Sequence, residues 1–102
     1  MIQESVMKLQ KLGPLPSSND ADPGTLEIWQ DQVEKIKRPV SDDDVDILIR
    51  LFGPDECFGL MWTLIHFIET APNWPMLALL KSLNGYPIDI MKERCRNSGY
   101  KI

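Results

Sequence analysis

The sequence is poor in the residue types that build metal, redox and nucleophilic sites. It holds two cysteines, Cys57 and Cys95, and one histidine, His66, among 102 residues. Their spacing fits no metal-binding motif, so we expect free thiols, no metal and no cofactor. A Gly-rich phosphate loop, a serine nucleophile motif and an HExxH motif are also missing. These absences leave little support for an enzyme.

Long apolar runs and targeting signals are missing as well. The most apolar stretch, Cys57 to Ile68, is too short to cross a bilayer. The first twelve residues lack the basic and apolar regions of a signal peptide, so we expect a cytoplasmic protein. A net charge of −4 argues against nucleic acid or an anionic membrane as a partner. No small-molecule ligand is expected.

What the chain does contain is helical periodicity, and no segment alternates like a strand over five residues or more. We expect one all-α domain over residues 1–102, a compact bundle of five to six short helices around one central apolar helix. Residues 1–21 are predicted as an N-terminal helix and a partly ordered linker. A HEAT-like stack of helical hairpins is one possible arrangement. The predicted helices cover about residues 2–12, 23–38, 42–52, 56–71, 75–83 and 86–97.

Two helix starts are clear in the sequence, and one helix is expected to be buried all round. Asp22 precedes Pro23 as a cap, and Ser41 with Asp44 forms a capping box. Between Cys57 and Ile68 apolar side chains fall on every helical face, so other helices should surround this segment. It is the expected centre of the bundle.

The strongest charge signal is a run of carboxylates at the start of the third helix. Capping explains one or two of them, but four carboxylates repel one another unless a partner uses them. A compact acidic surface suits an inhibitor that occupies a basic nuclease site. Trp74 lies in a proline-flanked turn, where it either packs on the core or anchors a partner. The expected partner-binding residues are Asp31, Asp42, Asp43, Asp44, Asp46 and Trp74.

His66 and Glu69 raise the only catalytic alternative. They lie three residues apart, so they can meet on one helix face as an acid–base pair. The simpler expectation is a histidine packed in the core or a groove. An enzyme that uses this pair would need an open, polar pocket around His66.

Residues 46–52 and 57–75 resemble small bacterial immunity proteins of polymorphic toxin and contact-dependent growth inhibition systems. The pattern Phe-Gly-x-x-Trp-x-Leu-x-His-x-Ile-Glu-Thr-Ala-Pro, from Phe58 to Pro72, carries the resemblance. Arg94 and the segment Asn97-Ser98-Gly99 also fit, so the resemblance covers roughly residues 24–99.

The resemblance implies a protein that is not an enzyme. Such proteins bind the C-terminal domain of a cognate toxin, often a nuclease, and block it in the producing cell. It also implies that the motif positions define the fold, and that toxin contacts lie outside them. These positions are Trp62, His66, Glu69, Thr70 and Trp74. The alternative is a helical adaptor that binds a peptide or protein partner in a groove.

Overall fold

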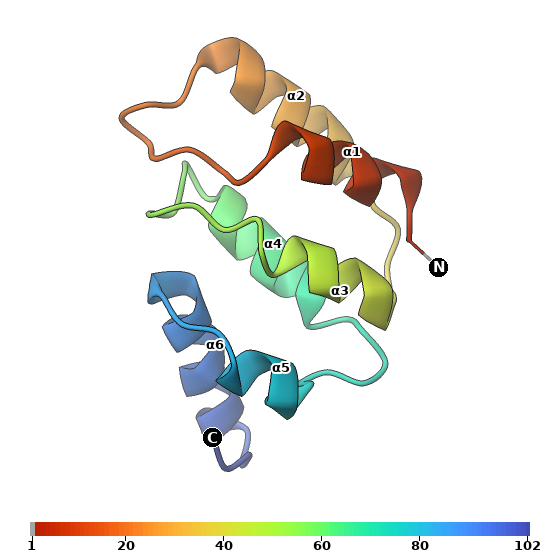
Figure 1. Cartoon of the computed structure of the whole chain (residues 1–102), viewed down its shortest axis with the longest axis vertical. Coiled ribbons are helices and arrows are strands. Elements are labelled where there is room, and N and C mark those ends of the chain that lie inside the picture. The colour runs from red at the N-terminus through yellow and green to blue at the C-terminus, as the bar shows by residue number, and fades with distance from the viewer. Residues whose placement is uncertain (1) are drawn as a thin grey trace.

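Six short helices make up the computed structural model, which describes residues 2–102 (Figure 1). They are α1 (Glu4–Leu12), α2 (Pro23–Glu34), α3 (Asp42–Leu48), α4 (Leu60–Ile68), α5 (Leu77–Lys81) and α6 (Tyr86–Asn97). The described residues contain no strand, so the predicted all-α class is confirmed. The molecule measures 40 × 30 × 18 Å. None of the helices described between residues 2 and 102 combines the length and apolarity needed to cross a membrane.

Both clear helix starts lie where the sequence predicts them. The Asp22 carboxylate accepts a hydrogen bond from the Thr25 N–H at 3.1 Å, with Pro23 as the first helical residue. At the start of α3 the Asp44 N–H donates to the Ser41 hydroxyl at 3.1 Å. The Ser41 N–H donates in turn to the Asp44 carboxylate at 2.9 Å. Each cap satisfies N–H groups that have no partner inside the helix.

Helix α4 is shorter than predicted and is not buried all round. Cys57 and Phe58 adopt left-handed backbone conformations, with φ of 45° and 55°, so the helix cannot start at residue 56. It runs from Leu60 to Ile68 instead of reaching Ala71. Met61, Leu64, Ile65 and Ile68 are fully buried, but Trp62 is partly exposed and His66 is exposed. The expectation that other helices surround this segment on every side is therefore wrong.

Helix α1 packs between α2 and α3, and α3 packs on α4 (Figure 1). On the inner face of α1, the side chains of Val6 and Leu9 are completely buried. Trp29 anchors α2 in the same core. Helices α5 and α6 lie at the opposite end of the molecule from α2 (Figure 1).

The predicted linker after α1 is held against the rest of the fold. The Leu15 N–H donates to the Leu51 carbonyl at 2.9 Å, and the Leu15 side chain is buried. Further along, the Ser18 N–H and hydroxyl donate to the Asp55 carboxylate. Gly53 permits the close approach, because a Cβ there would lie 2.2 Å from the Leu15 carbonyl oxygen.

Candidate functional site

The carboxylate at the centre of the predicted acidic site is part of the fold. Asp44 is only 1% exposed. Besides the Ser41 cap, it accepts a hydrogen bond from the Gln3 N–H at 2.9 Å. Its carboxylate therefore ties α1 to α3, and it is not accessible to a partner.

The other carboxylates of this turn are more exposed, and none of them lacks a partner. Asp42 accepts hydrogen bonds from the N–H and side-chain amide of Asn73, the residue before Trp74. Asp46 pairs with Arg50 at 3.2 Å. The structure thus brings the acidic turn (Asp42, Asp43 and Asp46) close to the Trp74 turn. Trp74 itself is half-buried and packs against the core.

Asp31 belongs to a different surface from the acidic turn. It lies on α2 between Glu27 and Glu34, and this spacing places the three carboxylates along one side of the helix. All three are exposed, and none has a hydrogen bond or ion pair among residues 2–102. We call this surface the acidic flank of α2. The sequence predicts Asp31 as a partner-binding residue, but it does not single out Glu27 or Glu34.

A groove of about 380 Å³ separates the acidic flank from the start of α4. Gln30 and Glu34 line it from α2, and Phe58 and Thr63 line it from the other side. Phe58 is 69% exposed, the largest value among the exposed large apolar side chains described. An exposed aromatic ring that shares a groove with the unpaired Glu34 carboxylate has the composition of a protein-binding surface.

The backbone around Cys57 explains why Phe58 lies outside the core. The Asp55 carboxylate accepts hydrogen bonds from the Ser18 N–H at 2.9 Å and the Cys57 N–H at 2.9 Å. These bonds hold the pKa of Asp55 below its ordinary value, the Ser18 bond most strongly, because they stabilise the carboxylate form. The turn buries Cys57 completely and leaves Phe58 at the surface. Sequence periodicity places Phe58 in the helix and therefore misses this exposure.

His66 and Glu69 do not form the acid–base pair that the sequence permits. Both Glu69 carboxylate oxygens accept hydrogen bonds from the Arg94 guanidinium, each at 2.7 Å. This contact raises the pKa of Arg94 above its ordinary value. His66 is exposed instead of packed in the core, and its ring centroid lies 6.5 Å from that of Trp62. The Glu69–Arg94 ion pair fixes α6 to the end of α4.

Both cysteines are free thiols, as the sequence predicts, and both are buried. Burial raises the pKa of the Cys57 thiol, and the nearby Asp55 charge adds to the effect. Burial also raises the pKa of Cys95. A thiol with a raised pKa holds little of the reactive thiolate at neutral pH.

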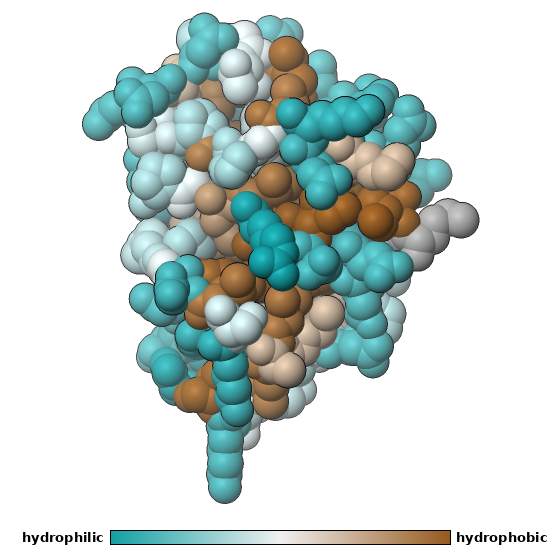
Figure 2. Space-filling model, in the orientation of Figure 1, coloured by the Kyte–Doolittle hydropathy of each residue, from teal (hydrophilic) through white to brown (hydrophobic). Residues whose placement is uncertain are grey.

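The face drawn in Figure 2 shows how the polar and apolar side chains are distributed. Apolar residues are visible in the middle of this face, over α1 and α3, and hydrophilic side chains surround them.

Comparison of the chain with protein-family models, curated proteins and solved structures finds no match.

Proposed function

We propose that this protein is a cytoplasmic immunity protein that binds the C-terminal domain of a cognate bacterial toxin and neutralises it without catalysis. The toxin is expected to be a nuclease with a basic active site. The observation that supports this function best is the exposed ring of Phe58, which shares a groove with Glu34, one of the three unpaired carboxylates of the acidic flank. We place the contact there, with the acidic turn of α3 as the competing surface.

The composition of the flank suits inhibition of a basic enzyme. Negative charge speeds the encounter with a positive surface and selects against acidic partners. An aromatic side chain that is buried on binding slows dissociation, since a few such anchors carry most of the binding energy. Glu27, Asp31 and Glu34 supply the charge, and Phe58 supplies the anchor.

The test begins with the protein encoded directly upstream. The two proteins are co-expressed and co-purified, and rescue from toxicity is scored in growing cells. Asp31→Lys with Glu34→Lys should weaken binding about 100-fold, at about 1.4 kcal/mol for each lost charge pair. Phe58→Ala should cost about 2 kcal/mol of binding free energy, as expected for an interface anchor.

The matched control places the same charge change on the other surface. Asp43→Lys with Asp46→Lys reverses two carboxylates on the acidic turn of α3. This variant should bind and protect nearly as well as the wild type. If it fails while the flank variant protects, the contact lies on the acidic turn. If the wild type neither binds the upstream protein nor protects cells against it, the immunity function is wrong.

A helical adaptor is the second candidate function, and the groove between α2 and α4 is the observation that favours it. Its volume of about 380 Å³ and its mixed lining suit a short helix or an extended peptide. An adaptor would bind partners unrelated to any upstream gene. Growth rescue distinguishes the two functions, because an adaptor gives no protection against a toxin.

A further inference from the structure

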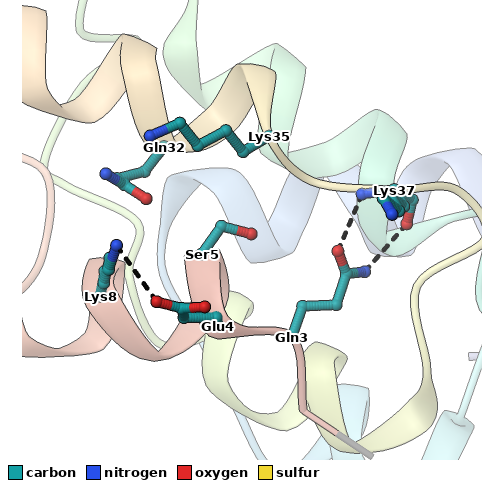
Figure 3. A pocket seen from close by; sticks show the side chains of 7 residues that line it. All are labelled: Gln3, Glu4, Ser5, Lys8, Gln32, Lys35 and Lys37. Atoms are coloured by element: carbon teal, nitrogen blue, oxygen red, sulfur yellow. Dashed lines mark hydrogen bonds and ion pairs between the residues drawn. The ribbon is translucent and has the colours of Figure 1, made fainter.

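A second cavity, of about 450 Å³, lies between the first turn of α1 and the end of α2 (Figure 3). Its lining includes three lysines from separate parts of the chain, although the protein as a whole is acidic. We call it the lysine pocket. Figure 3 shows Lys8 and Lys35 on one side around Gln32, Lys37 on the other side, and Ser5 between them.

Two polar groups of the lysine pocket lack partners inside the protein. Ser5 is only 7% exposed, and its hydroxyl forms no hydrogen bond with any residue described between 2 and 102. The Gln32 side-chain carbonyl oxygen is buried and has no donor. Of the two groups, only the Gln32 oxygen is fully closed to solvent. A buried polar atom without a partner is costly and calls for an explanation such as a ligand. Here the ligand would need acceptors for Ser5 and a donor for Gln32.

The lysines give the pocket a net positive charge. Glu4 is the one carboxylate in the lining, and its side chain is 80% exposed. It pairs with Lys8 at 3.3 Å, so part of the Lys8 charge is compensated. Lys35 and Lys37 have no ion pair among the described residues. The positive N-terminal end of α1 and the negative carbonyl end of α2 both border the pocket, so the two helix dipoles oppose each other. The positive potential of the pocket therefore comes from the lysines.

The position of Lys37 is set by Gln3. The Gln3 side-chain amide donates to the Lys37 carbonyl oxygen at 2.9 Å and accepts from the Lys37 N–H at 2.8 Å. A glutamine amide can make both bonds at once because it carries a donor and an acceptor. The backbone after α2 is therefore fixed across the pocket from Lys8.

We propose that the lysine pocket binds a tetrahedral oxyanion that also carries a hydroxyl donor, of which hydrogen phosphate is the simplest example. Its charged oxygens accept from Lys8, Lys35 and the Ser5 hydroxyl, as lysine ammonium groups commonly bind phosphate. Its P–OH group donates to the buried Gln32 oxygen. Sulfate has the same shape and charge but no hydroxyl at neutral pH, so it leaves Gln32 without a donor.

The phosphate could be free or part of a small organic molecule. The cavity volume falls within the range of small-molecule sites, which leaves room for a short hydroxylated group beyond the phosphate. Glycerol phosphate represents this second source. Tighter binding of glycerol phosphate than of inorganic phosphate would assign the site to a phosphate ester, and the reverse would assign it to the free ion.

The experiment is a titration of the full chain with inorganic phosphate, sulfate and glycerol phosphate at constant ionic strength, followed by amide NMR shifts. Phosphate should shift the amide signals of Ser5, Gln32 and Lys35. Its affinity should be at least about fivefold higher than that of sulfate, which corresponds to the free energy of one additional hydrogen bond. Equal affinities for phosphate and sulfate, or shifts spread over the whole surface, would overturn the proposal.

Two double variants with the same charge change complete the test. Lys8→Gln with Lys35→Gln removes two pocket cations and should weaken phosphate binding by at least about tenfold. Lys11→Gln with Lys81→Gln removes two exposed lysines outside the pocket and should leave binding unchanged. Circular dichroism confirms that each variant is folded. If both doubles weaken binding equally, the effect is one of net charge and the pocket is not a site.

Discussion

The two sides of α2 carry opposite charge and are built in different ways. The three carboxylates of the acidic flank come from α2 alone, and Phe58 is the main contribution from elsewhere. The lysine pocket combines α1, the end of α2 and the segment that follows it. A surface carried by one helix persists as long as that helix is docked. A pocket assembled from three segments depends in addition on the contacts that hold them in register.

Both surfaces depend on α2, so its removal from the core should have the largest effect. Trp29 is almost fully buried, and Trp29→Ala should lower the free energy of unfolding by about 4 kcal/mol. Urea denaturation measures this loss, and toxin and phosphate binding should fall together. Ile28→Ala, at an exposed neighbouring position, should change stability by less than about 1 kcal/mol. Loss of one binding activity alone in Trp29→Ala would show that the two surfaces do not share α2.

Gln3→Ala should separate the two surfaces. It removes both side-chain hydrogen bonds to the Lys37 backbone, which should cost about 1–2 kcal/mol in thermal or urea unfolding. Phosphate binding should weaken severalfold, while toxin binding stays at the wild-type level. Gln10→Ala on the exposed side of α1 is the matched control. A Gln3→Ala protein that binds phosphate normally would show that the Gln3–Lys37 bonds are not needed to hold the pocket together.

Acid should destabilise the turn that leaves Phe58 at the surface. The pKa of Asp55 is lowered in the folded protein, so its contribution to stability is complete above the ordinary aspartate value of 3.8. That contribution is lost as the pH falls through the lowered pKa. In Asp55→Asn this part of the pH dependence should be missing from melting temperatures recorded between about pH 2 and pH 5. Asp31→Asn keeps the Asp55 hydrogen bonds and should follow the wild-type curve.

The smallest expected change in stability concerns the single carboxylate of the lysine pocket. Glu4→Gln removes an exposed ion pair with Lys8 and should change the free energy of unfolding by less than about 0.5 kcal/mol. Phosphate binding should nevertheless tighten, because Lys8 no longer pairs with Glu4 and because the negative charge of Glu4 no longer repels the phosphate. Isothermal titration of phosphate into the variant measures this gain. Weaker binding would mean that Glu4 helps to hold the ligand.

Local signals were sufficient to predict much of the fold. The caps at Asp22 and Ser41 act within one helical turn, and the last helix begins at Tyr86 as its proline and periodicity indicate. The start of α4 could not be predicted in this way. Its position depends on the left-handed turn at Cys57 and Phe58, which Asp55 and the distant Ser18 stabilise.

The candidate surfaces were only partly predictable for a related reason. A run of aspartates is visible in the sequence, but the burial of Asp44 against Gln3 depends on residues 41 positions apart. The lysine pocket gave no sequence signal, because Lys8 is far from Lys35 and Lys37 along the chain. The sequence therefore predicted no small-molecule ligand. Charges can be counted from a sequence, but their neighbours are set by tertiary packing.

The attachment of the N-terminal segment has a consequence for the order of folding during synthesis. Gln3 bonds to Asp44, Leu15 to Leu51 and Ser18 to Asp55, so residues 3–18 pair in parallel order with residues 44–55. The Gln3–Asp44 bond needs 41 further residues, which a ribosome adds in roughly 2–8 s. Until then α2 is the only helix of the core on which Val6 and Leu9 of α1 can pack. Residues 3–18 therefore complete their packing only after residues 44–55 have been synthesised.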